Sequence, residues 1–295
     1  MINICTAKCL SCVYIAMLIL GGMCSDVAWG QPDEVSEPTL NKADVSSSIS
    51  AQDLVDLKPW AATLKEVVRG DQVLYSKLRE ARVRATLDQF LRSIEAPLPK
   101  TARANSLLAY WINAYNALTL RHVLRYPGLT SVSTAVPDAP RYEFFKQSVH
   151  LVAGQSRSLD EIEHQIIRPQ FRDPRVHAAL NCASRSCPPL SPTPYLARTV
   201  HQQLDDVARR FVNDPRRNQL SATPPQLSKI FAWFTEDFQS NERPKRSKYH
   251  GVVHFLRRFA NAKNLSIINT QWPKDLRSKD LSFKTYDWRL NGPKP

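Results

Sequence analysis

Cysteine is scarce after residue 30, since the rest of the chain contains only Cys182 and Cys187. The other four of the six cysteines lie within residues 1–24. Two cysteines exclude the disulfide-dense scaffolds of small secreted domains. Cys182 and Cys187 do not have CxxC spacing and no HExxH is present, so neither a zinc site nor a thioredoxin-like motif is indicated outside the first thirty residues. Internal repeats and long low-complexity tracts are also absent. The roughly 245 residues that follow residue 50 must therefore form an ordinary hydrophobic core.

The first thirty residues are typical of an export signal. Lys8 precedes an apolar stretch that runs to Met23, and Ala28-Trp29-Gly30 fits a cleavage site before Gln31. The apolar stretch is shorter than the roughly 20 residues that a membrane-spanning helix needs. We therefore predict a signal peptide over residues 1–30, a periplasmic or extracellular protein, and no transmembrane segment after cleavage. A membrane anchor is the alternative if the signal stays uncleaved.

Residues 31–50 contain two prolines, a serine run and no aromatic residue, which predicts a flexible linker. This linker carries four acids and Lys42, and the charges of residues 1–30 cancel. The whole chain has a formal charge of +13, so residues 51–295 carry about +16, with the densest basic cluster at residues 243–248. Such a charge favours an anionic surface as a partner. We expect no nucleic-acid partner, because the basic residues are not interleaved with aromatic ones.

The apolar spacing predicts a mostly helical domain. Helical periodicity covers residues 54–91, with interruptions near Pro59 and Gly70, and residues 105–125 and 252–259. Thr193 is the expected N-cap of another helix that continues to Phe211, and Ser158 with Glu161 predicts a capping box. Short strands are expected at residues 148–153, 176–180 and 282–288, whereas residues 227–238 fit either a strand or a helix. We predict one α+β domain over residues 51–295, mostly helical around a small β-sheet.

A series of motifs resembles those of a known family. Residues 111–117 read Trp-Ile-Asn-Ala-Tyr-Asn-Ala, residues 158–164 read Ser-Leu-Asp-Glu-Ile-Glu-His, and residues 173–182 read Asp-Pro-Arg-Val-His-Ala-Ala-Leu-Asn-Cys. Further matches follow at residues 186–188, 227–233, 237–238 and 286–288. With these motifs, from about Asp71 to Asn291, the chain is similar to domain-of-unknown-function family 547. The resemblance implies an exported bacterial protein with the fold of that family, and it implies no established reaction.

One residue departs from the pattern of the family. The family often has glycine directly after the first cysteine of this motif, where the chain has Ala183. Alanine resists positive φ, which glycine accepts freely. We therefore expect the turn between the two cysteines to differ slightly from that of the family.

The two cysteines allow several interpretations. A local Cys182–Cys187 disulfide is feasible if the turn brings the Cα atoms within about 7 Å, and an oxidising compartment favours it. Alternatively, one thiol is a nucleophile that a nearby base activates. We favour Cys187, with Cys182 in reserve, because the positive end of the helix expected near Thr193 would stabilise a thiolate. Thiol–disulfide redox chemistry is a third interpretation, which the absence of CxxC weakens.

Two histidines are candidate bases. His164 shares a helix face with Glu161, so this pair would form a surface salt bridge or orient the base. His177 lies in an apolar run, where a satisfied core histidine is the alternative. Glu161, both histidines and Cys182 are acceptable zinc ligands, but no paired ligand spacing supports a metal. We predict no metal and no cofactor.

Polar residues in apolar surroundings complete the candidate site. Asn113 and Asn116 lie three apart in a long apolar helix, where they would form either a buried network or groups that orient a substrate. Asp237 and Asp287, each beside aromatic residues, would anchor backbone amides or bind a ligand. Tyr286 would belong to the core or to the wall of a pocket.

Together these residues indicate a cysteine-dependent hydrolase or transferase that acts on amide or thioester bonds of an unknown small-molecule or peptide substrate. Cys187 would be the nucleophile, His164 or His177 the base, and Asn113 a polarising group, in analogy to papain-like or transglutaminase-like sites. The alternative is a non-catalytic binding module, in which the cysteines form a structural bridge and a basic face meets an anionic partner.

Overall fold

Helix α5 (Ala104–Val123) is the most buried element of the computed structural model, which describes residues 53–136, 142–239, 250–273 and 280–293. The predicted signal peptide, the predicted linker and the basic cluster at residues 243–248 lie outside these ranges. Almost every residue of α5 from Ser106 onward is buried, as its apolar sequence requires. This confirms the helix that the sequence predicts over residues 105–125.

Within the described ranges, three helices precede α5, and the last of them packs against it. They are α2 (Lys58–Val67), α3 (Tyr75–Arg79) and α4 (Ala81–Ser93), and Trp60 of α2 stacks on Phe90 of α4 with ring centroids 5.6 Å apart. Between α2 and α3 the strands β1 (Val68–Arg69) and β2 (Gln72–Val73) form a hairpin that turns at Gly70, where φ is +56°. Gly70 therefore interrupts the helical pattern as predicted. Pro59 instead lies in the first turn of α2, where proline is well tolerated.

The segment after α5 returns along it. The short helices η1 (Val132–Thr134) and α6 (Glu143–Lys146) lead to an antiparallel hairpin of β3 (His150–Val152) and β4 (Gln155–Arg157). One continuous helical stretch then consists of α7 (Leu159–Glu161), a π-helical segment η2 (Ile162–Ile167) and α8 (Arg168–Phe171). The predicted capping box of Ser158 and Glu161 is present at its start.

The strand expected at residues 176–180 is wrong. Residues 176–178 belong to the 3-10 helix η3 (Pro174–Ala178), which begins at Pro174 because Asp173 accepts a hydrogen bond from the amide of Arg175 and proline occupies the first helical position.

The next long helix, α9 (Val200–Asn213), begins later than predicted. Its N-cap is Thr199 and not Thr193. The side chain of Gln203 accepts from the amide of Leu196 and donates to the carbonyl of Pro194, which holds the preceding segment in a non-helical path.

The chain after α9 is also mainly helical. The elements are β5 (Gln226–Leu227), α10 (Lys229–Trp233), η4 (Thr235–Phe238), α11 (His250–Phe259), α12 (Ala262–Gln271) and β6 (Ser282–Phe283). The ambiguous stretch at residues 227–238 is therefore mostly helical, and the helix predicted at residues 252–259 is confirmed. The strand expected at residues 282–288 is limited to β6, which pairs in parallel with β5.

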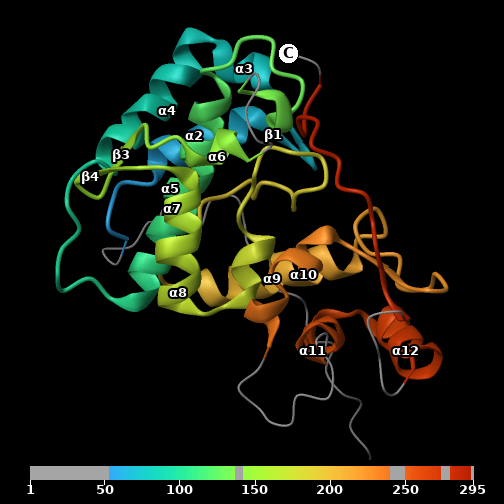
Figure 1. Ribbon diagram of the computed structural model, residues 1–295. Helices are drawn as coiled ribbons and strands as arrows, with labels where there is room; N and C mark the ends of the chain where they lie inside the picture. The colour runs from blue at the N-terminus through green and yellow to red at the C-terminus, as the bar shows by residue number, and fades with distance from the viewer. Residues whose placement is uncertain (1–52, 137–141, 240–249, 274–279, 294–295) are drawn as a thin grey trace, which may run out of the picture. The chain divides into compact units, whose positions relative to one another are not determined.

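The mostly helical α+β class is confirmed. In the described ranges the strands form three separate two-stranded sheets rather than one sheet. After α12 the C-terminal segment runs back toward β1, as the red trace in Figure 1 shows, and the amide of Val73 donates to the carbonyl of Asn291. This return brings residues 286–291 against the loop that carries both cysteines.

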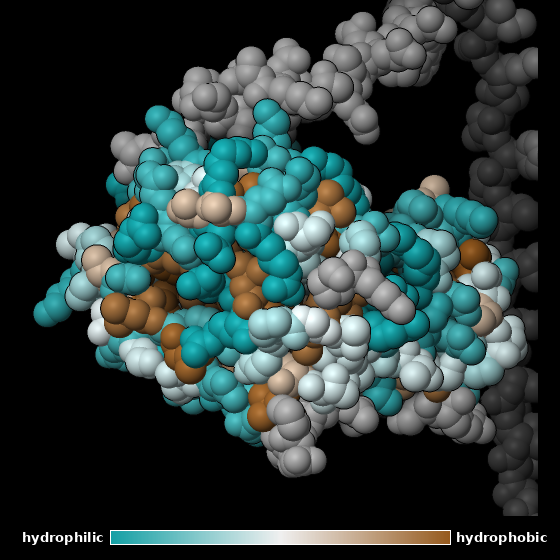
Figure 2. Space-filling view, turned by 90° about the horizontal axis from the view of Figure 1, so that it is seen from above, coloured by the Kyte–Doolittle hydropathy of each residue, from teal (hydrophilic) through white to brown (hydrophobic). Residues whose placement is uncertain are grey.

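The surface of the described part is largely polar. The face shown in Figure 2 is mostly hydrophilic, with hydrophobic side chains visible in small areas between charged ones. None of the helices in the described ranges is long and apolar enough to cross a membrane.

Candidate functional site

A cavity of about 380 Å³ lies beside the two cysteines. Its lining includes the aromatic residues Tyr142, Phe145, Trp233, Phe234, Tyr286 and Trp288. Both candidate histidines, His164 and His177, also line it, together with Cys182 and Cys187. The fold therefore brings four of the predicted catalytic residues and the predicted binding residue Tyr286 to one cavity.

Cys182 and Cys187 are joined as a disulfide, with their Cα atoms 6.0 Å apart. The local bridge that the sequence allows is therefore present in the structure. Cys187 is 4% exposed, whereas Cys182 is partly exposed and its Sγ lies 3.1 Å from the hydroxyl of Tyr286. The helix-dipole argument for Cys187 is wrong, because the next long helix begins only at Val200. Cys182 is thus the more accessible of the two sulfur atoms.

Asn116 and Asn181 hold the turn that carries the cysteines. The amide group of Asn116 donates to the carbonyl of Ala179 at 3.0 Å, and its Oδ1 accepts from the backbone amide of Asn181 at 2.8 Å. Asn181 then donates to the carbonyl of Pro188 and accepts from the amide of Ala183. Ala183 adopts a φ of +63°, so the turn uses the left-handed conformation although alanine resists it. Asn116 therefore positions the cysteine turn from within α5.

Asn113 takes part in a second buried network. Its Oδ1 accepts from the indole Nε1 of Trp60 at 3.2 Å and from the amide of Tyr195 at 2.9 Å, and its Nδ2 donates to the carbonyl of Tyr195 at 2.7 Å. Asn113 is 1% exposed and does not line the cavity. These contacts correspond to the buried network that the sequence analysis considers, and a polarising role for Asn113 stays a prediction.

His177 is oriented by Asp237. The side chain of His177 is 3% exposed, its Nε2 lies 2.7 Å from Oδ2 of Asp237, and its ring stacks on Phe234 with centroids 4.1 Å apart. Arg168 donates two further hydrogen bonds to Asp237, at 2.6 and 3.0 Å. Burial alone would raise the pKa of Asp237, but the hydrogen bonds from His177 and Arg168 outweigh it and hold this pKa well below its ordinary value. Asp237 is therefore an anion that accepts a hydrogen bond from Nε2 of His177.

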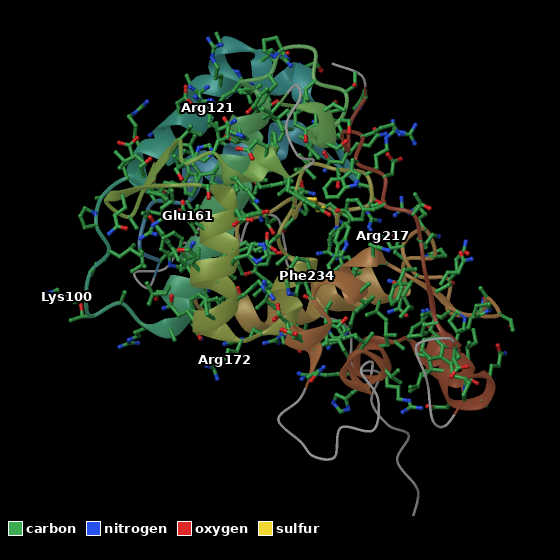
Figure 3. The ribbon with its side chains drawn as sticks, viewed as in Figure 1. Lys100, Arg121, Glu161, Arg172, Arg217 and Phe234 are labelled. Atoms are coloured by element: carbon green, nitrogen blue, oxygen red, sulfur yellow. A yellow bond between two sulfur atoms is a disulfide. The ribbon has the colours of Figure 1, made fainter. Side chains whose placement is uncertain are left out.

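His164 has other partners than the expected Glu161. Arg168 approaches Nδ1 of His164 at 2.5 Å, and Nε2 of His164 lies 3.7 Å from Asp160. Glu161 instead accepts from the backbone of Ser158 and from the hydroxyl of Ser148. The π-helical segment η2 changes the angular spacing along this stretch, so that residues three apart no longer share a face. Glu161, labelled in Figure 3, thus caps the helix rather than orienting a base.

The remaining predicted residue, Asp287, lies outside the cavity lining. Its carboxylate accepts from Arg289, and its backbone amide donates to the hydroxyl of Ser186. The hydrogen bonds from Arg289 lower the pKa of Asp287. Asp287 therefore fixes the C-terminal segment against the cysteine loop.

Sequence reasoning did not find Arg168, nor the pairing of Tyr115 with Glu163. Arg168 follows His164 by four residues, which is the spacing that places two side chains on one helix face, so this signal was present. Tyr115 donates to Glu163 at 3.0 Å, and both line the cavity. Figure 3 shows Phe234, whose ring stacks on that of His177, near the centre of the view.

Within the described ranges no group of three or more His, Cys, Asp or Glu residues is placed to hold a metal ion.

Comparison with known proteins gives one match. Residues 99–212 match the model of the family described as "Protein of unknown function, DUF547". This segment contains α5, both candidate histidines and both cysteines, and the match supports the resemblance that the motifs indicate. No curated protein and no solved structure matches the chain.

Proposed function

We propose that the cavity is the active site of a cysteine-dependent hydrolase or transferase that acts on amide or thioester bonds. The observation that carries the proposal is that His177, which Asp237 orients from outside the cavity lining, lines the same cavity as both cysteines. Because Nε2 of His177 donates to Asp237, Nδ1 carries the lone pair and is the basic nitrogen. Nδ1 of His164 instead faces a donor, Arg168, which makes His164 the weaker candidate.

Cys182 is the proposed nucleophile, and Cys187 is the cysteine to which it is joined in the oxidised form. Cys182 is the more exposed cysteine, and the hydroxyls of Tyr286 and Ser184 both lie 3.1 Å from its Sγ. Ser184 donates to the oxygen of Tyr286, which leaves the proton of Tyr286 free for a second acceptor. Burial raises the pKa of Tyr286, so this hydroxyl stays protonated and can stabilise a thiolate or an oxyanion.

The reaction requires the reduced form of the pair. A dithiol reductant transfers two electrons to the disulfide and is itself oxidised to a disulfide, which leaves two thiols. Nδ1 of His177 then takes the proton of Cys182, and the thiolate forms a bond to the carbonyl carbon of the substrate. The leaving amine or thiol departs with the proton of His177. Water or an acceptor nucleophile finally cleaves the thioester to Cys182 and returns a proton to this sulfur through His177.

The aromatic residues in the lining of the cavity favour a substrate with an apolar or planar group next to the reacting carbonyl. Trp233 lies against Tyr286 and Trp288, with centroids 4.7 and 5.6 Å away, and Tyr142 contacts Trp288 edge-on. Trp233 and Tyr142 are 38% and 43% exposed, so their rings offer free surface.

Thiol labelling tests the assignment. The purified protein is treated with iodoacetamide at about pH 6 and about pH 8, with and without reductant, and labelled cysteines are identified by peptide mass spectrometry. We expect no labelling before reduction, then faster labelling of Cys182 than of Cys187, with the rate of Cys182 still high at the lower pH. His177→Gln should slow the labelling of Cys182 at least about tenfold at the lower pH, whereas His254→Gln, on the exposed side of α11, should leave it unchanged. Equal, ordinary thiol reactivity of both cysteines in all three proteins would refute the proposal.

The disulfide itself favours a second candidate, a non-catalytic binding module with a structural bridge. This function predicts that reduction lowers the stability and that a ligand of the cavity is bound without turnover. Calorimetric titration of the reduced protein with a ligand of the cavity, together with the thiol labelling, separates the two functions, because the binding module requires binding without turnover and equal, ordinary reactivity of both cysteines.

A further inference from the structure

A second cavity, of about 390 Å³, shares Tyr286 with the first and has several cationic side chains in its lining. Five of its lining residues are basic, and one, Asp71, is acidic. The basic residues come from four separate segments and are Arg185, Arg216 with Arg217, Lys229 and Lys284. This cavity has no part in the chemistry proposed for the cysteines.

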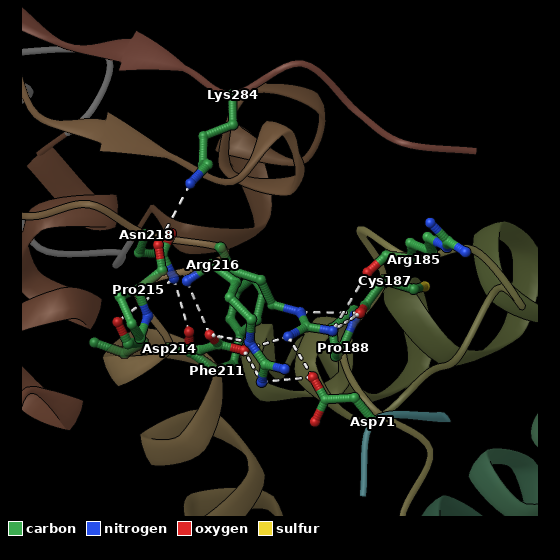
Figure 4. Close-up of polar contacts among 12 residues, drawn as sticks. Asp71, Arg185, Cys187, Pro188, Phe211, Asp214, Pro215, Arg216, Asn218 and Lys284 are labelled. Atoms are coloured by element: carbon green, nitrogen blue, oxygen red, sulfur yellow. Dashed lines mark hydrogen bonds and ion pairs between the residues drawn. The ribbon is translucent and has the colours of Figure 1, made fainter. Parts of the chain in front are cut away.

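Two of the five cations are neutralised by neighbouring carboxylates. Arg216 contacts Asp71 at 2.5 Å and Asp214 at 2.9 Å, and Arg217 contacts the same two carboxylates. Arg217 is 6% exposed and also donates to the carbonyl of Cys187 at 2.6 and 3.0 Å. Figure 4 shows Arg216 joined to these two carboxylates. Both arginines are thus fixed parts of the framework.

Three cations remain without an ion pair among the described residues. Arg185 donates to the carbonyl of Leu290, Lys284 donates to the carbonyl of Pro215 at 3.4 Å, and Lys229 lies 6.0 Å from the ring centroid of Phe283. In the view of Figure 4, Lys284 lies above the network around Arg216, and Arg185 lies to its right. The cavity therefore offers positive charge from more than one direction, and Asp71, the one acidic residue of its described lining, is already paired with Arg216 and Arg217.

We propose that this cavity binds the phosphate group of a small molecule or of a lipid. Guanidinium and ammonium groups are the main side-chain donors to phosphate oxygens, and the fixed Arg216 and Arg217 raise the local potential without occupying the space. The volume is ample for a phosphate ester. This inference rests on the charges and the cavity alone and holds whether or not the cysteines are catalytic.

Isothermal titration calorimetry of the full protein with pyrophosphate tests the site. We expect saturable binding that weakens at least about tenfold in the double variant Lys229→Gln/Lys284→Gln. The double variant Lys65→Gln/Lys100→Gln removes the same charge from exposed positions outside the cavity and should bind like the wild type. No saturable binding, or an equal loss in both double variants, would overturn the proposal.

Vesicles separate the two sources of the phosphate group. Binding of pyrophosphate together with co-sedimentation on phosphatidylglycerol vesicles, both reduced by Lys229→Gln/Lys284→Gln, assigns a lipid headgroup. Pyrophosphate binding without co-sedimentation assigns a soluble phosphate ester. If the wild type does not bind pyrophosphate, and the variant co-sediments with the vesicles as well as the wild type does, the proposed site is contradicted.

Discussion

Replacement of Asn113 by alanine should destabilise the fold far more than a surface substitution does. The change removes the hydrogen bonds to Trp60 Nε1, to the amide of Tyr195 and to the carbonyl of Tyr195. All three groups lie in a buried environment, and each unsatisfied buried group costs about 1–3 kcal/mol. Alanine recovers about 0.6 kcal/mol through its higher helix propensity. We expect a net loss of about 4 kcal/mol in the free energy of unfolding.

Urea unfolding, followed by tryptophan fluorescence, measures this loss. With a urea dependence of about 2–3 kcal/mol/M, the midpoint should fall by about 1.5 M. Asn105→Ala, at an exposed position of the same helix, is the matched control and should change the stability by less than about 0.5 kcal/mol. Asn113→Asp keeps the acceptor but loses the donor and should also destabilise. A loss below about 1 kcal/mol for Asn113→Ala, with the reactivity of Cys182 abolished, would refute the structural role and favour the polarising one.

Three further predictions concern other parts of the fold. The rings of His122 and His150 face each other with centroids 5.0 Å apart, and burial lowers the pKa of His122 to about 4 and that of His150 to about 3. Because the unfolded chain protonates these histidines at a higher pH than the folded protein does, the free energy of unfolding should fall as the pH drops from about 6.5 toward 4. The expected loss is about 3 kcal/mol for His122 alone. Urea unfolding at a series of pH values measures this loss, and a free energy of unfolding that does not change over this range contradicts it. Reduction of the Cys182–Cys187 bond, which closes a short loop, should lower the free energy of unfolding by about 2 kcal/mol, and an unchanged calorimetric transition would oppose this. Arg217→Ala leaves Asp71 and Asp214 without this partner and should cost about 3–5 kcal/mol in urea unfolding, with a cost below about 1 kcal/mol as the contrary result.

The helices could be predicted where one residue pattern determines the local structure. The continuous apolar sequence of α5 and the capping box at Ser158 depend on neighbours within one or two turns, and both are present. The start of α9 could not be predicted in this way. Thr193 and Pro194 form a good local start signal, but Gln203 and Asn113 hold the segment around Tyr195 in another conformation. Contacts between distant residues therefore override the local preference.

The members of the site could be predicted better than their pairings. His177, Cys182, Cys187 and Tyr286 lie together, as residue chemistry indicates. The partner of His177, however, is Asp237, sixty residues away, and this distance in sequence carries no periodicity that reveals it. The local pairing of Glu161 with His164 failed for the opposite reason, because the π-helical segment changed a spacing that a regular helix would keep.

The positions of the cavity-lining residues in the sequence determine the order in which the cavity can be assembled during synthesis. The cysteines are five positions apart, so they can meet by closing a short loop as soon as both have been synthesised. Trp233, Tyr286 and Trp288, which line the cavity, follow much later in the chain, beyond the segment 99–212 that matches the family model. A nascent chain therefore exposes both thiols before the walls that enclose them exist. Early pairing of Cys182 with Cys187 would protect these thiols from other partners until the C-terminal segment closes over them.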